Sequence, residues 1–373
     1  MDGGKPVKLP SLHVRNFRML EDFTLEKLGR VNLLVGGNNS GKSTVLEAVR
    51  VYATAAELDV LLDICKRREE NIKYSSAFQS LWTRQQTPKQ EQVMRIGEAT
   101  PDTDNVLIIE IAHIANTEKI EPDGSRSVST TVIHTSSSPR PFSITDTIIP
   151  VWHVRKNNLH QRFISFQYHQ PSQINGEYRL SPPCEYRPAT EFMSGDALSK
   201  IWKNIALTPK EKTVLQVLKI IDSSIEDYRF IRHEEYGESA IVRLKEQQST
   251  IPLRSMGDGV AHALQIALQI HAAQGGFLLI DEFENGLHYS IQEKVWEMVF
   301  ALAEDLDIQV FATTHSRDCI SSFAAVANRN KVTEGMLIRM GRSVLKRDNN
   351  KVIGTAYNEE ELAAVLEMSR DVR

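Results

Sequence analysis

The segment Gly36-Gly37-Asn38-Asn39-Ser40-Gly41-Lys42-Ser43 constrains the fold of this 373-residue chain more than any other feature. It fits the pattern G-x-x-x-x-G-K-[ST], in which glycines let consecutive backbone N–H groups approach a polyphosphate closely. Lys42 supplies positive charge to the β- and γ-phosphates, and the hydroxyl of Ser43 is a ligand for Mg²⁺. This phosphate loop therefore predicts a site for ATP and Mg²⁺, and Thr44, which follows directly, is counted with it.

The residues around the phosphate loop predict a strand, a loop and a helix in that order. Residues 31–35 form an apolar run before a glycine pair, which is typical of a buried strand. Val45, Leu46, Val49 and Ala53 fall on one face of the helix that follows, and the helix N-terminus adds a positive dipole. A glycine-rich turn without a ligand is the alternative, and the flanking strand and helix argue against it.

Two adjacent carboxylates follow a second apolar run. Asp281 and Glu282 come directly after residues 277–280, which predict a buried strand. Ligands of open α/β sheets bind at the C-terminal ends of the strands. We therefore expect Asp281 to hold Mg²⁺, directly or through water, and Glu282 to polarise the water that attacks the γ-phosphate. Solvated acids at an ordinary strand end are the alternative, which the upstream phosphate loop disfavours.

Two further loops adjoin predicted elements. The signature segment, Ser255-Met256-Gly257-Asp258-Gly259, precedes a predicted helix, and serine and glycine at a helix N-terminus favour anion binding. The switch loop, Thr313-Thr314-His315-Ser316, follows the predicted buried strand 308–312, from which His315 can reach a γ-phosphate. Each segment alone is weak evidence, because S-x-G-x-G is usually a plain loop and a lone histidine is usually structural.

The order of these motifs resembles that of ABC-class ATPases. Residues 12–18 (LHVRNFR), 280–288 (IDEFENGLH) and 311–316 (FATTHS) resemble the branch that contains SMC-like, RecF-type and OLD-type (overcoming lysogenization defect) ATPases. The resemblance covers residues 10–50 and 250–320. It implies an α/β fold of the ABC-type ATPase head, with a RecA-like parallel sheet core, an antiparallel β subdomain and a mixed α/β insertion.

This resemblance implies a head-to-tail homodimer, or a higher oligomer, in which two protomers sandwich each ATP. Ser255 and Gly257 would contact the γ-phosphate of the ATP held by the partner subunit. Asn285 would lie in the loop between the two ATP sites, and His315 would be the switch residue.

The resemblance assigns three further positions. Arg18 and Asn38 match family positions that approach the nucleotide. The family also has a glutamine that follows a strand and ligates Mg²⁺, and Gln167, after residues 163–166, is the candidate here. The chain departs from the family after the signature glycines, where a basic residue is common and residues 260–262 read Val-Ala-His.

The motifs predict one ATPase core that an insertion divides. We expect residues 1–60 and 251–373 to form the core. The range 61–250 would be the insertion, β-rich over 106–168 and helical over 195–225.

Smaller features predict individual element boundaries. A capping box at Thr208 predicts the start of a helix. Two edge strands are expected at about 336–340 and 343–347, and Asn358 is expected to cap a C-terminal helix that packs or mediates oligomer contacts.

Composition excludes several other classes of protein. An apolar fraction of 41% excludes a disordered chain, and no apolar run is long enough to span a bilayer. Three cysteines without a CxxC pattern disfavour a disulfide scaffold or a zinc site, and the first ten residues carry no secretory signal. We therefore expect a cytoplasmic protein with no membrane partner.

Our leading hypothesis is an ATP-gated scaffold or sensor. Small ATPases that look like this one often act beside a separate effector, commonly Toprim-like, in bacterial anti-phage defence. Only 58 residues follow His315, too few for a Toprim domain, so we expect any nuclease to be a separately encoded effector. ATP would set an assembly state, and turnover would be slow.

The alternative is a DNA-acting repair ATPase of the RecF or SMC type. Its best support is the stretch 140–162, which carries Arg140, Arg155, Lys156 and Arg162 against one carboxylate. A solvated insertion face explains the same stretch, and the formal net charge of −4 disfavours a dedicated clamp. Salt-dependent duplex binding in the presence of ATP discriminates between the two functions.

Overall fold

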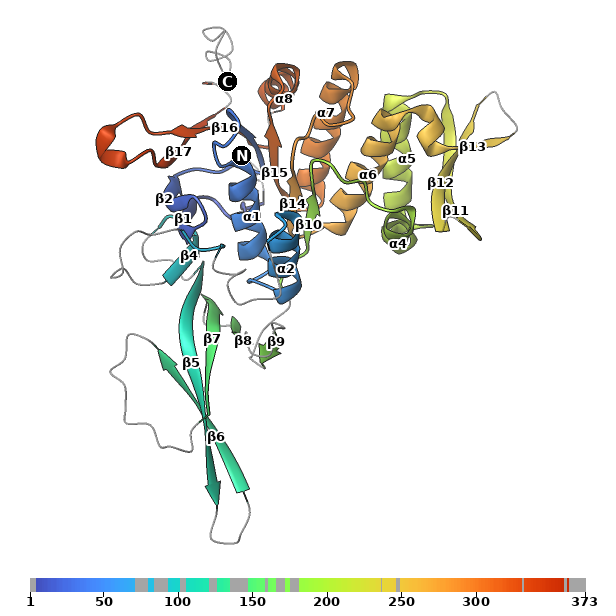
Figure 1. The fold of residues 1–373 in the computed structure, drawn as a ribbon. Helices are drawn as coiled ribbons and strands as arrows, with labels where there is room; N and C mark the ends of the chain where they lie inside the picture. Colours follow the sequence, from blue (N-terminus) through green and yellow to red (C-terminus); the bar gives the residue numbers. More distant parts are fainter. Residues whose placement is uncertain are drawn as a thin grey trace.

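Three sheets organise the protein. The computed structural model describes residues 5–70, 80–83, 93–100, 105–120, 126–134, 147–157, 160–165, 172–174, 181–235, 237–245, 249–330, 332–358 and 361. Figure 1 shows a central sheet between helices, an antiparallel sheet that extends away from it, and a small sheet at the outer side of the helical region.

The central sheet has the strand order β10-β14-β15-β3-β16-β17. The bounds are β10 Cys184–Arg187, β14 Phe277–Ile280, β15 Gln309–Thr314, β3 Val31–Val35, β16 Gly335–Arg342 and β17 Val352–Tyr357. The strands from β10 to β16 are parallel, and β17 is an antiparallel edge. Because they are parallel, the C-terminal ends of β10, β14, β15 and β3 meet at one edge of the sheet.

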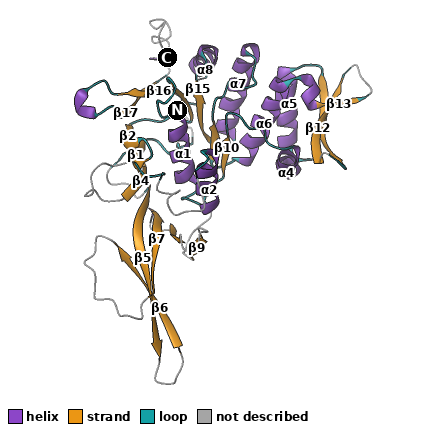
Figure 2. Ribbon diagram, in the orientation of Figure 1, coloured by secondary structure: helices purple, strands orange, loops and turns teal. Residues whose placement is uncertain are grey.

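The antiparallel sheet has the order β2-β1-β4-β5-β7-β8-β9, with β6 paired to β5. The bounds are β1 Leu12–Phe17, β2 Leu20–Leu25, β4 Val93–Gly97, β5 Val106–Ile120, β6 Arg126–His134, β7 Thr147–Lys156, β8 His160–Ser165 and β9 Ser172–Ile174. The far halves of β5 and β6 form an arm that points away from the rest of the molecule (Figure 2). An α/β ATPase head with a parallel core and an antiparallel β subdomain is therefore confirmed.

Helices cover both faces of the central sheet. On one face lie α1 (Lys42–Ala53) and α2 (Leu58–Arg67), together with β1 and β2. On the other lie α6 (Asp258–Ala272), α7 (Tyr289–Asp305) and α8 (Arg317–Arg329). Outside α6 pack α4 (Gly195–Ile205), α5 (Pro209–Ile221) and the small sheet, whose strands are β11 (Ile225–His233), β12 (Gly237–Leu244) and β13 (Thr250–Pro252).

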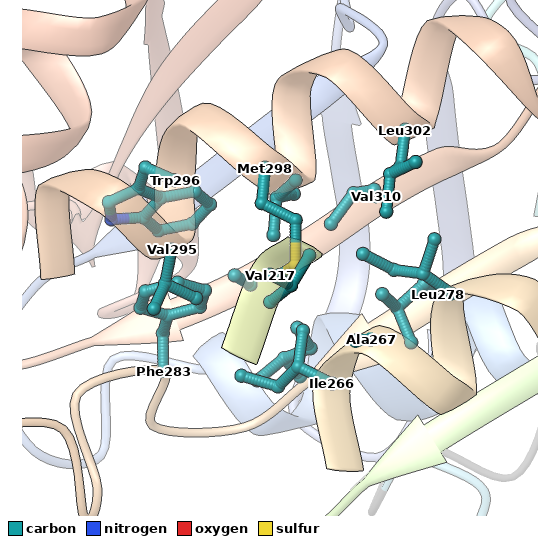
Figure 3. Packing of buried hydrophobic residues seen from close by; sticks show 14 of the residues in the cluster. Val217, Ile266, Ala267, Leu278, Phe283, Val295, Trp296, Met298, Leu302 and Val310 are labelled. Atoms are coloured by element: carbon teal, nitrogen blue, oxygen red, sulfur yellow. The ribbon is translucent and has the colours of Figure 1, made fainter. Parts of the chain in front are cut away.

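The core follows from the alternation of side chains along the central strands. In β3, Leu33 packs with the α6–α8 layer and Leu34 with the α1 layer, because successive side chains point to opposite faces. Both faces are covered, so β3 is buried along its whole length, as its mainly apolar sequence predicts. Figure 3 shows the α6–α7 side, where Phe283 stacks on Trp296 with ring centroids 3.7 Å apart. Phe283 directly follows Glu282, so this packing anchors the carboxylate end of β14.

The range 61–250 contributes strands to both large sheets. β10 lies within it and pairs in parallel with β14 at the edge of the central sheet. β4 lies within it too and continues the sheet that β1 and β2 begin. The range 61–250 therefore contributes strands to two sheets of the ATPase head.

Two local expectations need correction. A strand at 343–347 is wrong: β16 ends at Arg342, a 3₁₀ turn η4 occupies Lys346–Asp348, and the second strand is β17. The helix start predicted at Thr208 is confirmed, because Thr208 is the N-cap of α5, but its side chain does not cap the helix: the hydroxyl donates to the Ile205 carbonyl instead.

The cap at Asn358 is present in the described residues. Asn358 and Glu361 exchange side-chain to backbone hydrogen bonds at 2.9 and 3.0 Å, the pattern of a capping box. The rest of the expected helix lies outside the described residues. Among the described helices, none is long and apolar enough to cross a membrane.

Candidate functional site

The phosphate loop leads from β3 into α1 through backbone conformations that require its glycines. Gly36 and Gly41 have φ of +149° and +97°. A Cβ at Gly36 would lie 2.4 Å from the carbonyl oxygen of Met340, so only glycine fits between the loop and β16. Asn39 also has positive φ, at 63°, which asparagine tolerates better than most residues.

Lys42 lies folded over this loop. Its Nζ donates to the carbonyls of Gly36 and Gly37 at 2.9 and 3.0 Å, and the residue is only 5% exposed. Burial lowers the pKa of Lys42, while the negative charges of Asp281, Glu282 and Glu284 oppose that shift. The ammonium group therefore faces the acidic end of β14 across the loop.

A chain of hydrogen bonds joins the start of α1 to the ends of β14 and β15. Ser43 Oγ donates to Asp281 Oδ1 at 3.2 Å, and Thr313 Oγ1 donates to the same oxygen at 2.6 Å. The backbone N–H of Glu282 donates to Thr313 Oγ1 at 2.8 Å. Hydroxyl and carboxylate oxygens are the ligands that Mg²⁺ prefers, so Ser43 and Asp281 fit that ion.

Glu282 has a strained backbone and a fixed carboxylate. Its φ is +52°, which is uncommon for a residue other than glycine and is typical of functional sites. Asn285 Nδ2 donates to Glu282 Oε2 at 2.6 Å and to the Ala189 carbonyl at 2.9 Å. The carboxylate is therefore held by the loop that follows β14.

A cavity of about 330 Å³ lies between the phosphate loop and the switch loop. Its lining residues are Gly36, Gly37, Asn38, Thr314, His315, Arg317 and Ile320. The backbone N–H of His315 donates to Glu284 Oε1 at 2.9 Å, and the His315 side chain is exposed. The structure thus brings Asn38 and His315 together at one opening.

Three expected site residues lie apart from this cluster. Ser255 and Gly257 are exposed at the N-terminus of α6 and do not line the cavity. Arg18 forms ion pairs with Glu47 and Glu70 at 2.9 and 2.7 Å. Its contact with nucleotide stays a prediction, and Gln167 lies outside the described residues.

Comparisons with known proteins agree with this geometry. The head domain of an Smc protein, solved bound to the C-terminal winged-helix domain of ScpA, has a similar fold: the TM-score is 0.51 at 11% identity, and the match covers 96% of this chain and 100% of the other. Two family models match, an AAA ATPase domain over residues 8–131 and an AAA domain described as putative AbiEii toxin, Type IV TA system, over residues 169–318. Both family models describe AAA ATPase domains, and the chain shares the fold of an Smc head.

Two relatives extend the comparison. An ATP/GTP phosphatase of Helicobacter pylori (strain ATCC 700392 / 26695) is 23% identical to this ATPase, over 95% of this chain and 96% of the relative. An uncharacterised protein of Methanocaldococcus jannaschii is 33% identical over 112 residues, which are 30% of this chain and 93% of the relative. The ATPase family models and the ATP/GTP phosphatase relative support ATP hydrolysis as the reaction of this chain.

Arg187 lies beside the loop that holds Glu282, and it was not predicted from the sequence. It ends β10 and is 1% exposed, and its guanidinium donates to His262 Nδ1 at 2.5 Å and to the Asn285 carbonyl at 3.0 Å. Burial lowers the pKa of Arg187 to about 10, against the negative charges of Glu284 and Asp281. A short strand ending in Arg-Pro, with a charge at the edge where ligands bind, was the available signal.

The basic stretch does not form an exposed patch in the described residues. Lys156 and Arg162 are 8% and 2% exposed, and Lys156 Nζ donates to the Tyr52 carbonyl at 2.7 Å, at the end of α1. Arg155 pairs with Glu110 at 3.0 Å. Two of the four basic residues are therefore directed into the structure, the Arg155 side chain is 41% exposed, and Arg140 lies outside the described residues, so DNA binding by this stretch stays a prediction.

Proposed function

We propose that this ATPase is an ATP-gated scaffold or sensor, whose two protomers close around ATP and control a separate effector. The observation that carries the proposal is the separation of the signature segment from the phosphate loop. Ser255 and Gly257 are exposed and lie outside the cavity of their own chain. A site that needs both segments is completed by a second copy, which supports a head-to-tail dimer.

In the proposed mechanism Glu282 is the general base. Asn285 binds Glu282 Oε2, which leaves Oε1 to accept the proton of the attacking water. Ser43 and Asp281 would hold Mg²⁺, which when bound supplies positive charge beside the phosphates. Lys42 and the backbone N–H groups of the phosphate loop would stabilise the charge that develops on the γ-phosphate, and His315 would report its presence.

The mass of the protein in the presence of ATP, measured by light scattering after gel filtration, tests this proposal. Glu282→Gln should bind ATP, hydrolyse it at least about 100-fold more slowly and run as a dimer, because removal of the base traps the closed state. Ser255→Arg is the matched control: it should bind ATP and stay monomeric. Lys42→Ala should lose ATP binding. A monomeric, ATP-loaded Glu282→Gln protein contradicts the sandwich, and wild-type hydrolysis by that variant contradicts the base assignment.

The separate effector belongs to bacterial anti-phage defence in this proposal, and a Toprim-type nuclease is the expected class. The AbiEii toxin description of one family model supports a role in defence. The Smc head with a similar fold was solved with a partner, ScpA, which supports a head that holds another protein. The cytoplasm is the expected compartment, and turnover is expected to be slow because ATP sets an assembly state.

Co-purification with the product of an adjacent gene tests this part. The complex should form with wild-type protein and change its composition when Glu282→Gln is loaded with ATP. A protein that purifies alone beside every neighbouring gene product contradicts the effector model and leaves ATP hydrolysis untouched.

A further inference from the structure

Arg187 lies where three segments of the ATPase meet. Its guanidinium binds the signature helix α6 at His262 Nδ1 and the loop after β14 at the Asn285 carbonyl. Its own carbonyl accepts the backbone N–H of Asp281 at 2.8 Å, since β10 and β14 pair in register. Figure 1 shows β10 beside β14 at the edge of the central sheet. One side chain therefore touches both the helix that carries the signature segment and the loop that follows the base.

The helix and the loop are also in direct steric contact. Gly286 has φ +74°, and a Cβ there would lie 1.9 Å from the His262 ring. The Phe192 ring also packs against the His262 ring, with ring centroids 4.0 Å apart. His262 thus contacts both Phe192 and the loop after β14, and a shift of α6 would press on Gly286.

Asn285 in turn determines where the carboxylate of Glu282 lies. Its amide donates to Glu282 Oε2 at 2.6 Å, and the strained φ of Glu282 shows that local backbone preference does not set this geometry. The relay therefore runs from His262 through Arg187 and Asn285 to Glu282.

The contacts of Arg187 do not indicate that it stabilises the folded protein. Its Nε and Nη1 are buried and have no hydrogen-bond partner among the described residues, which destabilises a folded protein. No carboxylate of the described residues forms an ion pair with it within 4.0 Å, although Glu284 and Asp281 attract its charge. A buried arginine with open donors at a ligand-binding edge indicates a role in the reaction.

We propose that Arg187 is a positioning residue that couples the signature helix α6 to the base Glu282 through Asn285. The inference rests on the proposed function of Ser255 and Glu282. When Ser255 engages the ATP held by the partner subunit, the displacement of α6 reaches Glu282 through His262, Arg187 and Asn285. Hydrolysis in one protomer thereby depends on whether its own signature segment is engaged.

The first test separates positioning from ligand contact and from stability. Arg187→Met should lower kcat about 10- to 100-fold and leave the KM for ATP and the affinity for a fluorescent ATP analogue within about twofold. Its Tm should stay within about 5 °C of wild type, because the open donors are removed with the charge. Arg187→Lys keeps one donor group and should recover part of kcat.

Arg30→Met is the matched control. Arg30 is 3% exposed, precedes β3 at the opposite edge of the sheet, and pairs with Glu304 and Asp307 at 2.8 and 3.1 Å. It should lower Tm and leave kcat unchanged. A raised KM at normal kcat in Arg187→Met would show contact with nucleotide, and a lowered Tm at normal kcat would show a structural role; either overturns the proposal.

The second test asks whether Arg187 acts through Asn285. The double variant Arg187→Met/Asn285→Ala should have a kcat within about threefold of Asn285→Ala alone, because one relay is cut twice. His262→Asn keeps an acceptor and should stay near wild type, whereas His262→Leu should match Arg187→Met. Multiplicative losses in the double variant overturn the relay. If Glu282→Gln hydrolyses ATP normally, the proposed function itself fails; if only Arg187→Met is normal, this inference alone fails.

Discussion

Thr313→Val is the sharpest test of how the strand ends build the site. Thr313 is fully buried, and its hydroxyl is the junction between Asp281, to which it donates at 2.6 Å, and the backbone N–H of Glu282, which donates to it at 2.8 Å. Valine has the same shape without the hydroxyl, so the change removes both hydrogen bonds and leaves packing unchanged.

The size of the effect follows from those two bonds. The N–H of Glu282 is left without its acceptor, and Asp281 Oδ1 loses its shorter bond and keeps the one from Ser43 at 3.2 Å. Leaving a buried donor unpaired costs about 1–3 kcal/mol. The Glu282 backbone is strained, so release of its N–H should also displace the carboxylate and lower kcat about 10- to 100-fold.

Phosphate release at saturating ATP and thermal unfolding measure the two parts of this prediction. Thr313→Ser keeps the hydroxyl and should retain kcat. Thr333→Val is the control, because Thr333 is a buried threonine whose hydroxyl donates to the Phe300 carbonyl; it should lower stability alone. A wild-type kcat in Thr313→Val, or equal loss in Thr313→Ser, refutes the reasoning.

Three other outcomes are expected. Gly36→Ala should abolish ATP binding because its Cβ would lie 2.4 Å from the Met340 carbonyl, whereas Gly341→Ala, with no atom within 4 Å, should bind normally in a fluorescence titration; equal binding by both would contradict this. Acidification from about pH 6.5 to pH 4 should lower the free energy of unfolding, with up to about 3 kcal/mol of the loss coming from His271, because burial lowers its pKa to about 4 and only the unfolded chain takes up the proton; burial also lowers the pKa of His262 to about 4, so His271→Phe should remove only part of this loss in urea unfolding. Lys156→Met should lower Tm and leave any duplex affinity unchanged in a gel shift, because its Nζ binds the Tyr52 carbonyl; lost affinity would support the basic stretch as a DNA surface.

The parts of the site that the sequence predicts are those that need only local pattern and strand direction. The phosphate loop carries Gly36 and Gly41 where φ is positive, and the apolar runs that precede the phosphate loop, Asp281 and His315 are buried parallel strands. Parallel strands put their C-terminal ends at one edge, so residues that follow different strands are expected to meet.

Arg187 could not be placed by the same reasoning. Its partners His262 and Asn285 are 75 and 98 residues away along the chain, and its strand is short and lies within the range expected to be an insertion. Its role depends on β10 joining the central sheet beside β14, which no local pattern specifies.

The basic stretch shows the same limit from the other side. Charge along a sequence does not say which way a side chain points, and Lys156 and Arg162 point into the structure. The sequence by itself therefore determined that this protein binds and hydrolyses ATP on an α/β core, because the phosphate loop and the Asp-Glu strand end carry their chemistry locally. Only the tertiary structure decided that Arg187 contacts both α6 and the loop after β14, and which charges face solvent, because both depend on contacts between segments far apart in the chain.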